Sequence, residues 1–128
     1  MAQTATDLTR ATEELLDAFN RSDLDAYTEA YEPLATLVVP PEGRVVSGRA
    51  QIRAATAPVF AGRPRLRSRV LKTVDGGGLA LTHARWELTG TDADGAPMTM
   101  TGRGTIVSQR RPDGTWGILL DDPMSPEG

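Results

Sequence analysis

The sequence predicts one small α+β domain over residues 1–128, with three helices packed on a curved antiparallel sheet. Two observations support this fold class. The first half of the chain carries apolar residues at helical spacing, beginning with Leu8, Ala11 and Leu15. The second half carries four long β-rich segments separated by Gly- and Asp-containing turns. A length of 128 residues fits a single domain, and we expect its ordered core at about residues 6–122.

Three helices are expected before residue 60. The first begins near Leu8, where Thr6 or Asp7 can cap it, and it ends before residues 20–22. The third occupies about residues 50–57, and Pro58 ends or kinks it. The second is short, starts after Ser22 or Asp23 and ends at Pro33, with an apolar stripe of Leu24, Tyr27, Tyr31 and Leu34.

The strands are expected in two groups. A short hairpin joins residues 35–39 to residues 44–47 through Pro40 and Pro41. The turn residues of the second half have strong sequence signals, among them Gly76–Gly78 and the Pro-Asp-Gly sequence at 112–114. Four strands connected in this way form an antiparallel meander. They cover residues 65–74, 79–89, 98–109 and 115–121.

Composition excludes several classes of function. Fourteen basic and seventeen acidic residues give a net charge of −3, which argues against a nucleic acid partner. The chain has no Cys and one His, so neither a disulfide nor a metal site is expected, and no cofactor is called for. No run reaches the ~18 apolar residues that span a bilayer, so no membrane association is expected. The absence of Cys and of a signal peptide suggests a cytoplasmic location.

Four arginines alternate along one segment, at positions 63, 65, 67 and 69. In a strand, this spacing places them on one face of the sheet. Such a row forms a solvated or interface face, or a stripe that binds anions.

The strand around Trp86 has two different faces. Ala80, Thr82, Ala84, Trp86 and Leu88 are small or apolar, so we expect this face to lie against the helices. The opposite face, which includes His83 and Arg85, is expected to point outward or into an interface. Small side chains beside a large indole leave space, which helix side chains fill or a ligand occupies. A ligand pocket would be lined by Trp86, Ala84, Met100, Phe19, Tyr27 and Tyr31.

Asp121 is the candidate proton shuttle. Alternation along the last strand predicts that Asp121 points inward, with Trp116 and Ile118 outward. Burial would raise the pKa of this carboxyl, although a strand-end Asp in water is the alternative. Arg103 is the second candidate catalytic residue, because it could reach a ligand oxygen or pair with Asp121. Simple alternation with Met100 and Ile106 inward would instead place Arg103 on the outer face.

The order of elements resembles the nuclear transport factor 2-like superfamily, and most closely its small SnoaL-like and SgcJ-type proteins of polyketide pathways. The resemblance covers nearly the whole chain, from Thr6 to Asp121. It rests on five strings in the same order: FNRSDLDAY at 19–27, VSGRAQIR at 46–53, WELTG at 86–90, GRGT at 102–105 and DGTW at 113–116.

The resemblance implies a cone-shaped α+β barrel that forms a homodimer through the outer face of its sheet. The superfamily includes isomerases, cyclases, dehydratases and epoxide hydrolases as well as binding modules, so the fold alone does not fix a function. The three functional positions of ketosteroid isomerase match Leu15, Val39 and Ile106 here, all apolar. That constellation is therefore disfavoured, and the paired acids of the epoxide hydrolases have no clear match either.

Two functions remain open. The first is a cofactor-independent isomerase, cyclase, dehydratase or hydrolase that acts on a polyketide-like or other apolar polycyclic molecule, with Asp121 shuttling the proton and Arg103 stabilising negative charge. The second is a non-catalytic module that binds a small apolar molecule or a protein partner. A packed dimer without any pocket is a third, simpler possibility.

Overall fold

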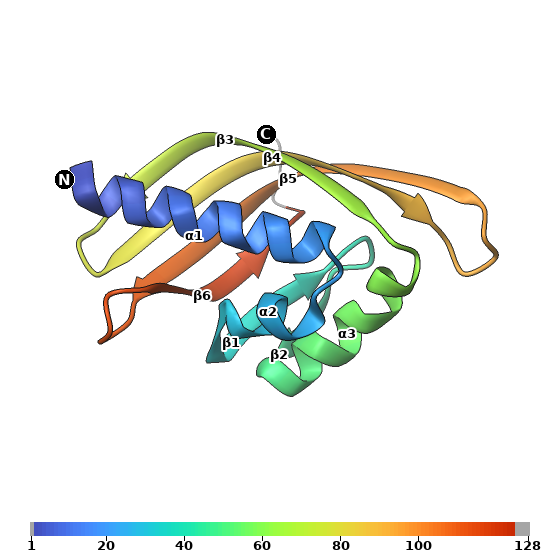
Figure 1. The fold of residues 1–128 in the computed structure, drawn as a ribbon, viewed down its shortest axis with the longest axis horizontal. Helices are drawn as coiled ribbons and strands as arrows, with labels where there is room; N and C mark the ends of the chain where they lie inside the picture. The colour runs from blue at the N-terminus through green and yellow to red at the C-terminus, as the bar shows by residue number, and fades with distance from the viewer. Residues whose placement is uncertain (1, 125–128) are drawn as a thin grey trace.

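Three helices lie on one side of a curved six-stranded sheet (Figure 1). The computed structural model describes residues 2–124, with side chains from Asp7 onward. The α+β architecture predicted from the sequence is confirmed. The elements in chain order are α1 (Ala2–Asn20), α2 (Leu24–Glu29), β1 (Tyr31–Val39), β2 (Arg44–Ser47), α3 (Arg49–Ala61), β3 (Arg65–Asp75), β4 (Leu79–Thr91), β5 (Pro97–Arg110) and β6 (Trp116–Asp122).

The sheet has the strand order β2-β1-β6-β5-β4-β3. Strands β3 to β6 form the predicted antiparallel meander, and β1 and β2 form the predicted hairpin. One contact was not predicted: β1 runs parallel to β6, so that Tyr31 lies opposite Ile118 and Leu37 lies opposite Asp121. This pairing joins the hairpin of the first half to the last strand of the chain.

The second helix is shorter than the sequence pattern predicted. It ends at Glu29, and Tyr31 is the first residue of β1 rather than part of a helical stripe. Leu34, expected on the same stripe, is 87% exposed. The physical reason is Pro33, which disfavours a helical conformation in the residue before it and has no N–H for a ladder. The parallel register with β6 shifts between Tyr31 and Thr36, where Pro33 lies.

Two other helix boundaries differ from the prediction. Helix α1 begins at Ala2, ahead of the expected caps at Thr6 and Asp7. Helix α3 continues through Pro58 to Ala61. The added turn buries Phe60 in the core, which offsets the hydrogen bond that Pro58 cannot make. The ordered core was expected at about residues 6–122; of the residues beyond it, 1 and 125–128 lie outside the described residues.

Strand β6 contains an irregularity that changes which side chains face the helices. Val107 lies opposite Leu120, but the next residue of β5, Ser108, lies opposite Ile118. Leu119 is therefore an extra residue, as in a β-bulge. The prediction that Trp116 and Ile118 point outward is wrong, because the extra residue puts both on the same face as Asp121. All three are buried, with exposures of 6%, 6% and 7%.

The main core lies between α2, α3, the end of α1 and the concave face of the sheet. Tyr31 and Ile52 are its largest fully buried side chains. A second, smaller cluster of Leu8, Ala80 and Trp116 lies under the first half of α1. Within residues 2–124, no helix is long and apolar enough to cross a membrane.

Candidate functional site

Asp121 lies near the end of β6 with its side chain in the protein interior. Its strand neighbours are Ile106 of β5 and Leu37 of β1, and it is 7% exposed. The inward orientation predicted for this residue is confirmed. It is the only carboxylic acid among the buried polar residues that the structure describes. A lone buried carboxyl needs a partner, because an unpaired charge in the interior is strongly unfavourable.

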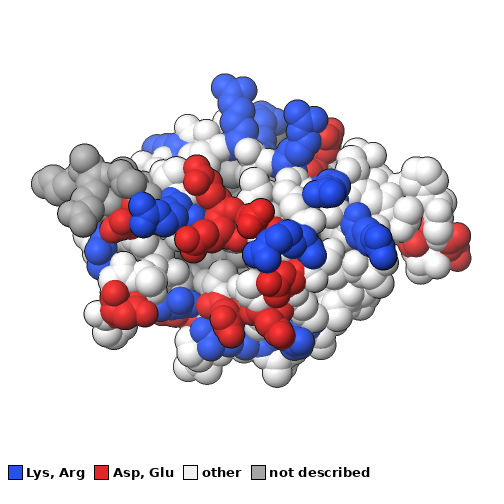
Figure 2. Space-filling model, in the orientation of Figure 1, with Lys and Arg blue, Asp and Glu red and all other residues white. Residues whose placement is uncertain are grey.

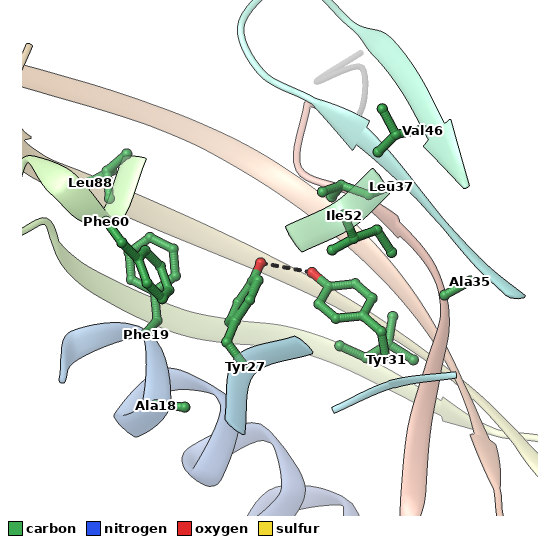
Figure 3. Close-up of a cluster of buried hydrophobic side chains, with 11 residues drawn as sticks. Ala18, Phe19, Tyr27, Tyr31, Ala35, Leu37, Val46, Ile52, Phe60 and Leu88 are labelled. Atoms are coloured by element: carbon green, nitrogen blue, oxygen red, sulfur yellow. Dashed lines mark hydrogen bonds between the residues drawn. The ribbon is translucent and has the colours of Figure 1, made fainter. Parts of the chain in front are cut away.

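Two tyrosines supply that partner. The hydroxyl of Tyr31 donates a hydrogen bond of 2.5 Å to Oδ2 of Asp121. The Tyr27 hydroxyl lies 2.8 Å from the Tyr31 hydroxyl, as the dashed line in Figure 3 shows. Because Tyr31 uses its proton on Asp121, Tyr27 donates to Tyr31. The result is a continuous chain from Tyr27 through Tyr31 to Asp121, which we call the tyrosine–aspartate chain.

Local structure positions both tyrosines. Asp23 caps helix α2 by accepting a hydrogen bond of 3.1 Å from the Ala26 N–H, which fixes the start of this short helix. Tyr27 then projects from α2 into the core, while Tyr31 projects from the first position of β1. Phe19 and Phe60 close the other side of Tyr27, with ring centroids at 5.6 Å and 5.5 Å in edge-to-face contacts.

Burial controls the ionisation of this chain. Desolvation raises the pKa of Asp121 to about 6, and the negative charge of Asp122 acts in the same direction. The hydrogen bond from Tyr31 acts in the opposite direction. Burial, followed by the charge of Asp121, raises the pKa of Tyr27 and of Tyr31, so both hydroxyls stay protonated. Asp121 can therefore exchange a proton close to neutral pH while the tyrosines remain donors.

Trp86 lies on the helix side of the sheet, and His83 on the opposite side. The indole packs over Gly102 on the neighbouring strand and donates a hydrogen bond of 2.8 Å to the Pro123 carbonyl. Trp86 and Met100 are half-buried and pack against the core cluster that contains Tyr27 and Tyr31. The predicted orientation of the Trp86 strand is therefore confirmed.

A cavity lies beneath α1, between this helix and strands β3 to β6. Its volume is about 50 Å³, which holds a few water molecules and is far smaller than the ligand-sized pocket expected from the small side chains. Ala84 lines it, as do Ile106 and Ile118, the strand partners of Asp121 and Tyr31. The cavity therefore approaches the tyrosine–aspartate chain through these two isoleucines.

Trp116 also lines this cavity, and its indole N–H is unusual. It is buried and has no hydrogen-bond partner within the described part of the chain. A buried donor without a partner is rare in proteins, so it marks a position where an acceptor would be stabilised. Sequence reasoning missed this residue because the bulge at Leu119 is what turns Trp116 inward.

Arg103 does not join the tyrosine–aspartate chain. It lies opposite Arg85 in the β4–β5 ladder, on the same face as Thr105 and therefore on the side of the sheet away from the helices. Asp121 is on the inner face, so the pairing of Arg103 with Asp121 considered from the sequence does not form. The structure thus brings together Asp121, Tyr31, Tyr27 and Phe19, places Trp86 and Met100 against the same core, and leaves Arg103 outside.

The described residues contain no group of three or more His, Asp or Glu side chains that could hold a metal ion. The chemistry that the site itself offers is proton transfer at one carboxyl, with two hydroxyl groups that stay protonated. Its surroundings are aromatic and aliphatic side chains.

Comparisons with known proteins place this fold in a family. The model of the SnoaL-like domain matches residues 12–116, so the chain belongs to the SnoaL-like domain family. A comparison with curated proteins gave no match.

Solved structures show the same fold at low sequence identity. A nuclear transport factor 2-like superfamily protein from Salmonella enterica is 17% identical, with a TM-score of 0.82 over 99% of this chain and 95% of that one. A ketosteroid isomerase-like protein from Erwinia carotovora is 22% identical, with a TM-score of 0.77 over 92% and 94%. A nuclear transport factor 2-like protein of unknown function from Shewanella oneidensis is 21% identical, with a TM-score of 0.76 over 94% and 98%.

Proposed function

We propose that this protein is a cofactor-independent enzyme that moves a proton on an apolar, polyketide-like small molecule, with Asp121 as the acid–base residue. The observation that carries the proposal is the tyrosine–aspartate chain. It holds a carboxyl of pKa about 6 in the interior of a fold shared with a ketosteroid isomerase-like protein. A carboxyl tuned in this way can both accept and return a proton near neutral pH.

Each residue of the tyrosine–aspartate chain has a role in the proposed reaction. Tyr31 occupies Oδ2 of Asp121, which leaves Oδ1 to take a proton from the substrate and return it at another atom. Tyr27 holds the Tyr31 hydroxyl in the donor orientation. Trp86 and Met100, half-buried on the same side of the sheet, would contact the apolar body of the substrate. Arg103 has no part in this proposal, because it lies on the other face.

The outer face of the sheet supports a homodimer. Val74, Leu81, Val107 and Leu120 lie directly opposite one another on four adjacent strands. Val74 is 46% exposed and Leu120 is 39% exposed. A continuous apolar row on an outer sheet face is a typical protein contact surface. We propose that a second copy of the chain covers this row.

The test of the catalytic role is proton exchange. A panel of polycyclic ketones would be incubated with the protein in D₂O, and the deuterium incorporated would be followed by mass spectrometry. Asp121→Asn should lower the rate by about 100-fold or more, in the range of general acid–base contributions. Asp94→Asn, which changes an exposed turn carboxylate, should leave the rate unchanged. Equal rates for wild type and Asp121→Asn would refute the assignment.

The small size of the cavity favours a second candidate, a module that binds a small apolar molecule without converting it. A cavity of about 50 Å³ leaves little room for a substrate unless α1 moves. This function predicts that ligands raise the melting temperature equally in wild type and Asp121→Asn, with no deuterium incorporated by either. Ala84→Val, which fills the cavity, should abolish that stabilisation if the ligand binds there.

A further inference from the structure

The outer face of the sheet carries a cluster of arginines that the proposed function does not use. Strand register places Arg69, Arg85 and Arg103 directly opposite one another on β3, β4 and β5. Arg67 lies two residues from Arg69 on the same face, opposite Glu87. Of the four alternating arginines noted in the sequence, Arg63 alone precedes the strand.

These side chains border one hollow. Its volume is about 800 Å³, and its lining includes the four arginines, Thr101, Glu87 and Met124. The volume falls within the range of small-molecule sites. The lining brings four guanidinium groups against one carboxylate, so the charge of the lining residues is net positive. Figure 2 shows the same asymmetry on the visible side: acidic side chains gather over α1, and basic side chains stand out along the edge formed by β3.

The arrangement is unfavourable without a counter-charge. Like charges directly opposite each other on adjacent strands destabilise a sheet. Within the part of the chain that the structure describes, Arg67, Arg69 and Arg103 make no ion pair. Some arginines elsewhere do form ion pairs: Arg21 with Asp17, Arg53 with Asp25, and Arg111 with Glu32. Three of the four arginines in the hollow, Arg67, Arg69 and Arg103, therefore have no ion-pair partner among the described residues.

We propose that this hollow binds a small molecule that carries two or more negative charges, a phosphate ester or a polycarboxylate. Planar guanidinium groups bind phosphate and carboxylate oxygens in pairs, and three of them on adjacent strands can surround one multivalent anion. The Thr101 hydroxyl adds a neutral donor, and Met124 offers an apolar contact for the organic part of the ligand.

The hollow does not include Asp121, Tyr31 or Tyr27, although Trp86 belongs to its lining. Asp121 lies on the opposite face of the sheet. The apolar row of Val74, Leu81, Val107 and Leu120 lies at the other end of the outer face, beyond the row that contains His83 and Thr105. One row of side chains therefore separates the apolar row from the row of Arg69, Arg85 and Arg103.

The test is calorimetric titration with inorganic pyrophosphate and, separately, with citrate, at an ionic strength held constant with NaCl. We expect saturable binding of at least one anion with a Kd below about 1 mM. Arg69→Gln and Arg103→Gln should each weaken it about tenfold, as expected for loss of a charge-assisted hydrogen bond. Arg103→Lys, which keeps the charge without the planar fork, should give an intermediate affinity. Arg44→Gln, on the distant strand β2, should bind like wild type.

Several results would overturn the proposal. One is that neither pyrophosphate nor citrate gives more heat of binding than a titration with NaCl at the same ionic strength. Another is that the two Arg→Gln variants bind as wild type does while their circular dichroism spectra remain native. An acidic peptide is titrated as well. If the peptide binds and neither pyrophosphate nor citrate does, the arginine face recognises a protein and not a small anion. Light scattering measures the oligomeric state of the same variants. If Arg103→Gln changes the oligomeric state but not anion binding, the arginines belong to a subunit interface.

Discussion

The hydroxyl of Tyr31 and the carboxylate of Asp121 are separated by 90 positions in the sequence and by 2.5 Å in the structure. The parallel pairing of β1 with β6 makes this contact possible, because it sets the first residue of one strand beside the inward face of the other. Both residues are buried. The hydrogen bond therefore acts in a medium of low dielectric, where its loss would strongly disfavour the ionised form of Asp121.

The first prediction concerns the dependence of stability on pH. Burial raises the pKa of Asp121 from 3.8 to about 6 in the folded protein. Between these values the folded state binds more protons than the unfolded state, so this residue's contribution to stability falls as the pH rises. Relative to Asp121→Asn, wild type should lose on the order of 3 kcal/mol between pH 3.5 and pH 7. Urea unfolding of both proteins at several pH values measures the difference.

The Asn variant is a suitable reference because its amide oxygen can still accept the Tyr31 hydrogen bond. A difference in unfolding free energy that stays constant from pH 3.5 to pH 7 would contradict the raised pKa. A difference that grows in favour of wild type over the same interval would show that the pKa is lowered instead.

The second prediction compares the two tyrosines. Tyr31→Phe removes the donor to a buried carboxylate and should lower the free energy of unfolding at pH 7 by about 2 kcal/mol. Tyr27→Phe removes a bond between neutral hydroxyls and should lower it by about 1 kcal/mol. Because the Tyr31 bond opposes the effect of burial, Tyr31→Phe should also raise the pKa of Asp121 above 6. Carbon-13 NMR of the carboxyl group reports that pKa directly.

Tyr27→Phe is the matched control for packing, since both variants keep an aromatic ring in the same core. Equal destabilisation by the two variants, with no change in the titration of Asp121, would mean that the chain is only a packing feature.

Much of this fold could be predicted from local patterns, and the exceptions have local causes. The four long strands were placed within one or two residues because their turns contain Gly and Pro. Tyr31 was assigned to the second helix because Leu24, Tyr27 and Tyr31 are three and four residues apart, which is the spacing of one helix face. The stronger signal was Pro33, which favours an extended conformation before it. The parallel pairing of β1 with β6 depends on contacts distant in sequence, which no local pattern encodes.

The candidate site was predicted only in part. Asp121 faces inward as expected, but its neighbours Trp116 and Ile118 do so only because of the extra residue Leu119. In the apolar run of β6, the sequence carries no signal for the position of a bulge. The alternation of β5 already favoured an outer position for Arg103, and the uninterrupted register with β4 agrees with it.

The third prediction concerns Gly102, over which the Trp86 indole lies. A Cβ at this position would approach Cζ2 of Trp86 to 2.5 Å, so Gly102→Ala should displace the ring and break its bond to Pro123. We expect a loss of about 1–3 kcal/mol, as for other overpacked sites. In a Trp116→Phe background, Trp86 is the only tryptophan, and its fluorescence maximum should shift to longer wavelength. Gly78→Ala, at an open position, should change neither quantity.

The last prediction concerns the ion pair between Glu32 of β1 and Arg111, the residue that follows β5. Arg111 donates from Nε to Glu32 at 2.8 Å and from its terminal nitrogen to the Glu29 carbonyl at 2.8 Å. Both side chains are mostly buried, with exposures of 23% and 16%. Gly117 lies beneath the pair, and a Cβ there would come within 2.7 Å of Arg111 Nε and closer still to the Glu32 carboxylate.

Gly117→Ala should therefore separate Arg111 from Glu32 and destabilise the protein by about 2 kcal/mol. Because Glu32 follows Tyr31 directly in β1, the same variant should also weaken the hydrogen bond to Asp121 and raise the pKa of that carboxyl. In a Glu32→Gln, Arg111→Gln background the ion pair is already absent, so adding Gly117→Ala should have a much smaller effect. Urea unfolding of the four proteins gives the coupling energy. If Gly117→Ala lowers the free energy of unfolding equally in both backgrounds, the effect comes from the backbone at Gly117 and not from the ion pair.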